Sequence, residues 1–69
     1  MAILHRGSKG EEVSRLQALL CLADFEAKPI DGDFGPGTER AVRACQESKG
    51  LSSTGQVDEE TQEVVGMNQ

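Results

Sequence analysis

The sequence predicts an all-α fold, a compact three-helix bundle with long loops that forms a single domain over residues 1–69. Three observations support this prediction. Apolar residues recur at helical rather than alternating spacing in three segments. Residues typical of helix starts precede each segment, and a glycine or a turn follows it. A chain of 69 residues buries only roughly 60% of its unfolded surface, which leaves no room for a catalytic domain beside a binding domain.

The first helix is predicted from Lys9 to Ala23. Ser8, just before the helix, and Glu11, three residues later, match the S-x-x-E capping box. In this motif the two side chains bond free backbone N–H groups, which is worth on the order of 1 kcal/mol. One stripe of the helix should face the core. Its members are Val13, Leu16, Leu20 and Ala23.

A repeated segment predicts the other two helices. Residues 32–42, GDFGPGTERAV, align with residues 55–65, GQVDEETQEVV. The shared frame is a glycine, an apolar residue, a helix cap, a threonine and an apolar pair. In this alignment Gly32 matches Gly55, Phe34 matches Val57, Gly35 matches Asp58, Thr38 matches Thr61, Ala41 matches Val64 and Val42 matches Val65.

Each position of the frame has a physical role. Gly32 and Gly55 allow turns with positive φ, and the apolar residue two positions later points inward. Gly35 and Asp58 are suitable N-caps. Pro36 fits the first helical position, because its missing N–H leaves no bond unmade there. The two threonines are placed to bond orphan backbone donors near the helix start.

The frame places the second helix at residues 36–49 and the third at residues 59–65, with Gly50 and Gly66 as their stops. Apolar residues of the connections, in 25–30 and at Leu51, should close the ends of the core. The helical side chains predicted to face inward are Ala41, Val42 and Cys45 of the second helix and Val64 and Val65 of the third.

The stretch DGDFGPGTERAV, residues 31–42, resembles the start of a calcium loop only superficially. Asp31 and Asp33 match the first two ligands of an EF-hand, but Gly35, Pro36 and Val42 replace its third ligand, its glycine and its closing glutamate. A catalytic carboxylate pair is also disfavoured, since nothing else in the chain supplies a nucleophile, a metal or a partner base. We therefore expect no catalytic residue, no metal site and no cofactor.

The cysteines and the histidine give no metal motif. Cys21 and Cys45 fit no zinc spacing, and His5 does not complete one. A disulfide between them is one possibility, but small apolar packing as free thiols is the default interpretation. Cys45 is expected to be buried and Cys21 partly buried.

Charge and hydropathy argue against two classes of partner. The net charge of −5 argues against nucleic-acid binding, which requires a basic face. No apolar run approaches the length of a membrane span. The beginning, MAILHRGSKG, lacks the apolar region of a signal peptide, which leaves a cytosolic start, an excised domain of an exported chain, or delivery by other means.

Taken in order, these motifs resemble the small peptidoglycan-binding domain found beside bacterial and phage cell-wall hydrolases. The resemblance covers about residues 7–65. The matching residues are Gly10, Val13, Leu16, Gln17 and Leu20, then Asp31, Gly32, Phe34, Gly35, Thr38, Ala41, Val42 and Gln46, then Gly50 and Leu51, then Gly55, Val57 and Thr61. Three positions depart from the family pattern: Cys45 replaces a Phe, Asp58 replaces a Gly, and Gln62 replaces an aromatic residue.

The resemblance implies a noncatalytic three-helix module that binds cell-wall peptidoglycan, by its glycan strand or its stem peptide, and tethers a fused or neighbouring hydrolase to its substrate. It implies a location in the cell wall or periplasm, and we expect a monomer. The alternative is a protein-interaction or regulatory domain that kept the fold and lost the glycopeptide site. Aromatic rings that could stack on sugars are scarce, which favours this alternative to some degree.

The candidate ligand-binding residues are Asp31, Asp33, Arg40, Gln17 and Arg43. For Gln17, as for Gln46, bonding to loop backbone is weighed above ligand contact. Asp31 is expected to bond its own turn in the first place. Arg40 and Arg43 stand one turn apart, where guanidinium groups could meet peptide carboxylates. The groove is expected where the 24–35 connection passes the start of the second helix.

Overall fold

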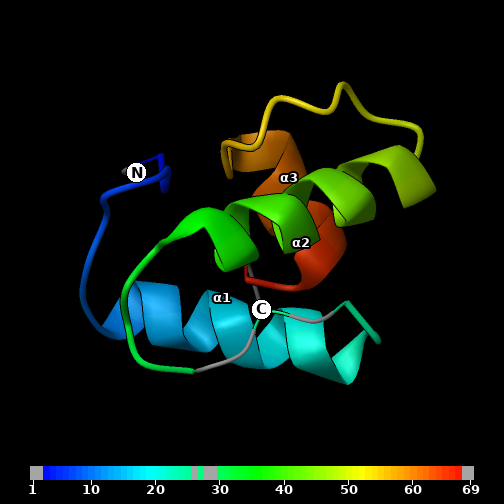
Figure 1. The fold of residues 1–69 in the computed structure, drawn as a ribbon. Coiled ribbons are helices and arrows are strands. Elements are labelled where there is room, and N and C mark those ends of the chain that lie inside the picture. Colours follow the sequence, from blue (N-terminus) through cyan, green and yellow to red (C-terminus); the bar gives the residue numbers. More distant parts are fainter. Residues whose placement is uncertain (1–2, 26, 28–29, 68–69) are drawn as a thin grey trace.

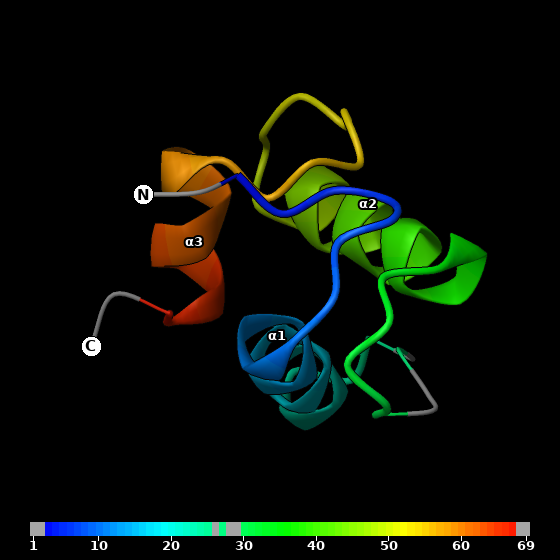
Figure 2. The ribbon, with the colours of Figure 1, turned by 90° about the vertical axis from the view of Figure 1, so that its left-hand side faces the viewer.

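Three helices form the domain in the computed structural model, which describes residues 3–25, 27 and 30–67. Helix α1 runs from Glu11 to Leu22, α2 from Pro36 to Ser48, and α3 from Glu59 to Val65. The molecule measures 27 × 24 × 21 Å. Figure 1 shows α2 above α1, and the quarter turn in Figure 2 places the three helices at the corners of a triangle. The predicted all-α three-helix architecture is confirmed.

The helix bounds follow the local sequence closely. Gly35 and Asp58 are the N-caps of α2 and α3, and Pro36 is the first residue of α2, as predicted. Gly66 closes α3 in the left-handed region with φ 94°. The predicted bounds of α3 are confirmed, and α2 ends one residue before Lys49, its C-cap. Among the described residues, no helix is both long enough and apolar enough to cross a bilayer.

The predicted capping box at α1 is wrong. The N-cap is Gly10, with no side-chain cap bond. Ser8 Oγ instead accepts the backbone N–H of His5 at 3.1 Å, and the backbone carbonyl of Ser8 accepts the N–H of Phe34 at 2.9 Å. Ser8 therefore belongs to the stretch that pairs with residues 33–34, and α1 begins only after Gly10, at Glu11.

Residues 4–10 are here called the N-terminal arm, which bonds both inter-helix connections and is interrupted by a turn at Arg6 and Gly7. Val57 N–H donates to the carbonyl of Leu4 at 2.7 Å, and Gly7 N–H donates to that of Phe34 at 2.9 Å. Antiparallel bridges pair Leu4 with Val57 and Lys9 with Asp33. In Figure 2 the arm, in blue, passes in front of the triangle before it turns into α1, and Figure 1 shows it at the left-hand edge of the molecule. The arm thus holds the two connections against the helices.

The core follows the predicted stripes with three corrections. Ala23 is exposed because it lies just beyond the end of α1. Ile30 is 50% exposed, and Val64, on the outer side of the short α3, is 37% exposed. Val65 and Phe25 pack against the core as partly buried residues. The buried hydrophobic residues are Leu4, Val13, Leu16, Leu20, Ala27, Phe34, Ala41, Val42, Cys45 and Val57.

The two cysteines lie as the helical pattern predicts. Cys45 is 1% exposed in the core, and Cys21 is half-buried at its edge. Both are free thiols. Burial raises the pKa of the Cys45 thiol, so this side chain behaves as a small apolar group.

Candidate functional site

The connection before α2, residues 30–35, is here called loop 1, and a buried glutamine holds its shape. Gln17, on α1, is 1% exposed. Its Oε1 accepts the backbone N–H groups of Asp31 and Gly32, both at 3.0 Å. Its Nε2 donates to Asp31 Oδ1 at 3.2 Å and to the carbonyl of Asp33 at 2.9 Å. The same Nε2 donates to Thr38 Oγ1 on α2 at 3.0 Å. One amide therefore joins α1, loop 1 and α2.

The two carboxylates of loop 1 are both exposed but differently held. Asp31 Oδ1 accepts the backbone N–H of Asp33 at 3.0 Å, which confirms its predicted role in its own turn. This bond, and then the Gln17 amide, lower the pKa of Asp31, so its carboxylate stays ionised. Asp33 Oδ1 lies 3.7 Å from the Lys9 ammonium, a solvent-exposed pair that contributes little to stability.

A hollow of about 210 Å³ opens between loop 1 and the first turn of α2. This is where the sequence predicts the groove, beside the start of the second helix. The lining combines two carboxylates with apolar and backbone surface of the helix start. Its residues are Gln17, Asp31, Asp33, Gly35, Pro36, Gly37 and Thr38.

The connection before α3, residues 51–58, is here called loop 2, and a second buried glutamine holds it in the same way. Gln46, on α2, is 1% exposed. Its Oε1 accepts the N–H of Gly55 at 3.0 Å. Its Nε2 donates to the carbonyl of Gln56 at 2.8 Å and to Thr61 Oγ1 at 3.0 Å. Thr54 Oγ1 accepts the N–H of Gln56 at 3.2 Å, the same turn that Asp31 makes in loop 1.

The two loops are also packed against the preceding helix in the same way, a likeness that the alignment of residues 32–42 with 55–65 does not show. Gly32, with φ 76°, lies so close to α1 that an added Cβ would sit 3.0 Å from Ser14 Oγ. Gly55, with φ 80°, has the same relation to α2: an added Cβ would sit 3.0 Å from Arg43 Nε. Ser14 and Arg43 each stand three residues before the glutamine of their helix. In both copies a helix therefore packs on a glycine and bonds the loop around it.

The predicted role of the repeated threonines is wrong. Thr38 and Thr61 were expected to bond orphan backbone donors at helix starts. Their hydroxyls instead accept from the glutamine amides, and at α3 the cap bond runs from Thr61 N–H to Asp58 Oδ1 at 2.9 Å. Sequence spacing could not reveal the pairing, since Gln17 and Thr38 lie on different helices. The sequence signal for this pairing is a Gln that directly follows a core position in each helix, with a Gly and a Thr later in the chain.

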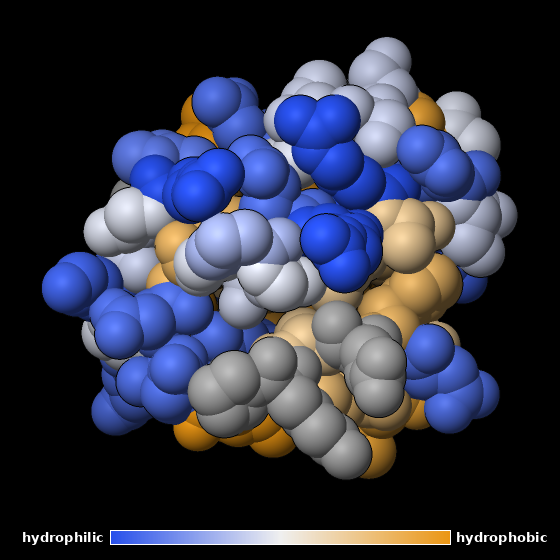
Figure 3. All heavy atoms as spheres, viewed as in Figure 1, coloured by the Kyte–Doolittle hydropathy of each residue, from blue (hydrophilic) through white to orange (hydrophobic). Residues whose placement is uncertain are grey.

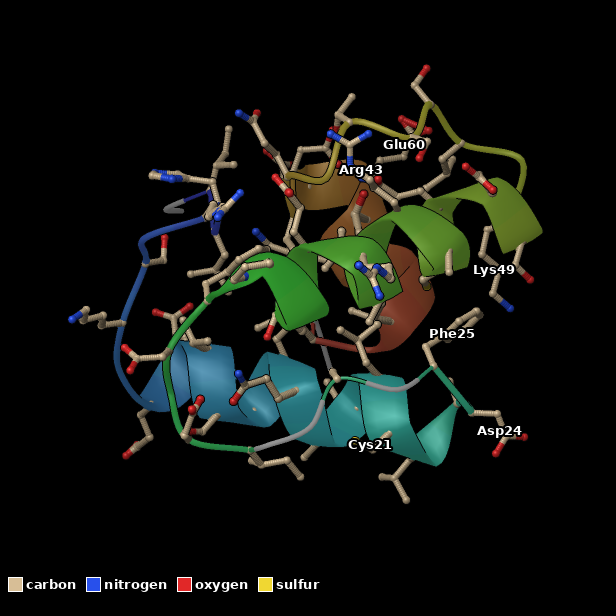
Figure 4. The ribbon with its side chains drawn as sticks, viewed as in Figure 1. Cys21, Asp24, Phe25, Arg43, Lys49 and Glu60 are labelled. Carbon is tan, nitrogen blue, oxygen red and sulfur yellow. The ribbon has the colours of Figure 1, made fainter. Side chains whose placement is uncertain are left out.

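The structure brings some candidate site residues together and separates others. Gln17, Asp31 and Asp33 meet at the 210 Å³ hollow. Arg40 is exposed on α2, one turn beyond Pro36, which lines the hollow, and so on the same side of the helix. Arg43 lies over Gly55 of loop 2 instead, and Figure 4 shows its side chain directed toward that loop. Arg40 therefore lies on the side of the helix that faces the hollow at loop 1, whereas Arg43 lies at loop 2.

Other hollows lie outside this group. One of about 130 Å³ sits between loop 2 and α3, and its residues are Leu51, Ser52, Asp58, Glu60 and Thr61. A wider one of about 590 Å³ lies between the N-terminal arm and the start of α1, lined by Ile3, Leu4, Ser8, Lys9, Glu11 and Glu12.

The surface beside α2 is mainly polar. Figure 3 shows hydrophilic residues over most of this face, with apolar colour toward the right-hand side, where Figure 4 labels Phe25 at the ends of α1 and α2. Phe25 is half-buried and Phe34 is 3% exposed. Within the part of the chain that the structure describes, no group of three or more His, Cys, Asp or Glu is placed to hold a metal ion.

Comparison with known families decides the identity. Residues 9–65 match the family described as "Putative peptidoglycan binding domain". The chain belongs to this family. The peptidoglycan-binding domain is 36% identical over 63 residues to the spore cortex-lytic enzyme of Bacillus cereus, an alignment that covers 91% of the domain and 24% of the enzyme. The domain thus spans about a quarter of the length of this relative.

Solved structures similar to the peptidoglycan-binding domain share its fold closely. The SleB N-terminal domain superposes with a TM-score of 0.91 at 34% identity, covering 97% of this chain and 92% of that one. The Burkholderia AP3 phage endolysin gives 0.90 at 31% identity, with coverages of 99% and 26%. A peptidoglycan-binding protein from Clostridioides difficile, in complex with glutamine hydroxamate, gives 0.90 at 32% identity, with coverages of 94% and 40%.

Proposed function

We propose that this domain is a noncatalytic module that binds peptidoglycan and holds a fused or neighbouring cell-wall hydrolase near its substrate. The match to the peptidoglycan-binding family over residues 9–65 carries the proposal. Spore cortex-lytic enzyme and phage endolysin among the similar proteins support the association with hydrolases. Tethering of this kind raises the effective concentration of an enzyme at its substrate without new chemistry. The cell wall or the periplasm is the corresponding location.

The proposed binding site is the hollow at loop 1 with Arg40 beside it. Asp31 and Asp33 present carboxylates there, which suit ammonium, amide or hydroxyl donors, and Arg40 presents a guanidinium that suits a carboxylate. A stem peptide carries both kinds of group. The stem peptide is therefore the favoured part of the polymer, because neither phenylalanine of the chain is fully exposed to stack on a sugar ring.

The ionisable side chains support a noncatalytic role. The imidazole of His5 is exposed, with its Nδ1 2.9 Å from the carbonyl of Arg6, rather than against a nucleophile. The thiol of Cys45 is buried and its pKa is raised by that burial, the opposite of what activates a cysteine nucleophile. We expect the domain alone to release no product from peptidoglycan.

A sedimentation assay with insoluble peptidoglycan tests the proposal. The parent domain should pellet with the polymer, weakly, and leave no soluble fragments. The double variant Asp33→Ala, Arg40→Ala should keep its melting temperature and lose this binding, since both side chains are exposed. Glu47→Ala, Lys49→Ala, which removes one charge of each sign at the far end of α2, is the matched control and should bind like the parent. Equal binding by both double variants would place the site elsewhere.

The second candidate function is protein interaction or regulation on the same fold. The observation in its favour is the position of the two aromatic rings, with Phe34 3% exposed in the core and Phe25 half-buried against it. A parent domain that stays in the supernatant with several wall types would favour this function.

Sedimentation velocity tests the expected monomer, which should persist at all concentrations.

A further inference from the structure

Gln17 and Gln46 make matching contacts with two loops of different chemistry. Gln17 holds loop 1, whose turn carries Asp31 and Asp33, and Gln46 holds loop 2, which has Thr54 in place of the first carboxylate. We propose that Gln17 is the positioning residue of the peptidoglycan site, whereas Gln46 serves folding alone. The inference rests on the proposed function and assigns how its site is held in shape.

Gln17 acts on a ligand through the loop rather than by contact. Its side chain is 1% exposed, and both ends of its amide are engaged. Oε1 accepts from the N–H groups of Asp31 and Gly32. Nε2 donates to Asp31 Oδ1, to the carbonyl of Asp33 and to Thr38. A ligand that competed for this amide would have to break bonds inside the domain.

The same bonds fix the direction of the Asp31 carboxylate and the backbone that carries Asp33. Asp31 Oδ1 is held between the Gln17 amide at 3.2 Å and the Asp33 N–H at 3.0 Å. The backbone on either side of Gly32 is held by the same amide. Thr38 fixes the amide itself relative to α2, which carries the other wall of the hollow. A site held in its bound shape before the ligand arrives loses less entropy on binding.

Loop 2 provides an internal control. Its glutamine bonds the loop backbone and a helix-start threonine, as in loop 1. No carboxylate stands in the turn of residues 54–56, and these residues do not line the neighbouring 130 Å³ hollow. Substitution of Gln46 therefore removes the same kind of packing and hydrogen bonding without reaching the proposed site.

Matched variants, Gln17→Met and Gln46→Met, separate positioning from folding. Urea unfolding of each gives its folded fraction, and sedimentation with insoluble peptidoglycan then gives the affinity of the folded molecules. Gln17→Met should weaken that affinity about tenfold, because loop 1 is then no longer held in its binding shape before the ligand arrives. Gln46→Met should change the affinity by no more than about twofold, because loop 1 keeps its shape.

A second readout does not depend on stability. Side-chain carboxyl NMR titration should show the pKa of Asp31 rising in Gln17→Met and unchanged in Gln46→Met, because Gln17, unlike Gln46, donates to Asp31 Oδ1. If Gln17→Met does not fold, Thr38→Val and Thr61→Val replace the pair. Thr38→Val removes an acceptor of the Gln17 amide, and Thr61→Val removes one of the Gln46 amide. Of these two variants, only Thr38→Val should weaken binding.

The outcomes separate the inference from the function on which it rests. A parent that binds, with Gln17→Met equally able to bind per folded molecule, would overturn the positioning role and leave the function standing. Equal losses of affinity in the two glutamine variants would overturn it as well, since both loops would then matter. A parent that fails to sediment with any wall type would remove the proposed function and the inference with it.

Discussion

The N-cap of α3 gives the sharpest stability prediction. Asp58 Oδ1 accepts the N–H of Thr61 at 2.9 Å, at the start of a helix of seven residues. Such a short helix is not stable alone, so its attachment depends on this bond and on a few core contacts. Asp58→Ala removes the acceptor while leaving the rest of the helix unchanged.

The expected loss for Asp58→Ala is about 1 kcal/mol in the free energy of unfolding, the usual value for an N-cap. In a domain of this size that loss lowers the melting temperature by roughly 4–8 °C. Asp58→Asn is the matched control, because its amide oxygen can accept the same bond. It should retain most of the stability, losing only the favourable interaction between the carboxylate and the helix dipole.

The effect of Asp58 also depends on pH with a definite sign. The Thr61 N–H, followed by the Thr61 hydroxyl, lowers the pKa of Asp58 below its ordinary value of 3.8. A carboxylate whose pKa is lowered by folding stabilises the folded state above its unfolded pKa, and this stabilisation is lost as the pH falls through the folded pKa. The stability gap between the parent and Asp58→Asn should therefore shrink below about pH 4.

Urea unfolding followed by circular dichroism at pH 7 and at pH 2.5 (roughly one to two units below the ordinary range) measures both effects. The pH 7 midpoints should rank parent, then Asp58→Asn, then Asp58→Ala. Equal midpoints for the parent and Asp58→Ala would refute the cap, and a gap between the parent and Asp58→Asn that widens in acid would refute the pKa argument.

The other predictions concern the buried network, a glycine and the thiols. Thr38→Val and Thr61→Val should each lower the free energy of unfolding by about 1 kcal/mol, because each removes one of the acceptors around a buried glutamine NH2 group; urea midpoints equal to that of the parent would contradict this. Gly55→Ala should cost at least about 1–2 kcal/mol from the left-handed backbone alone, read as a lower melting temperature. A reducing agent should leave the melting temperature unchanged because Cys21 and Cys45 are free, and a native mass lower by a pair of hydrogen atoms would argue otherwise.

The sequence predicts the helices well because local signals determine them. Asp58 before α3 and Gly66 after it act within a turn of the backbone they terminate, so the bounds of that helix follow from neighbouring residues alone. The capping box at Ser8 failed because the competing partner, Phe34, comes from a distant segment. Periodicity also does not show where a bundle ends, which is why Ile30 and Val64 were expected inside.

The candidate site was predictable in part for the same reason. Asp31 and Asp33 share one turn, so their proximity follows from the sequence. The buried contact of Gln17 with that turn depends on the packing of α1, which spacing alone does not specify. Arg43 was grouped with Arg40 by helical spacing, but the missing side chain of Gly55 leaves room for Arg43 over loop 2.

The N-terminal arm has a consequence for how fast this domain folds. Helical bundles usually fold quickly because most of their contacts are local, and a large mean sequence separation of contacts slows folding. Here the carbonyl of Leu4 accepts the N–H of Val57, far along the chain. Bringing these two residues together costs the conformational entropy of closing the long segment between them. We expect the helices to gain structure early and the pairing of Leu4 with Val57 to form after the transition state. Leu4→Ala should accordingly speed unfolding far more than it slows refolding.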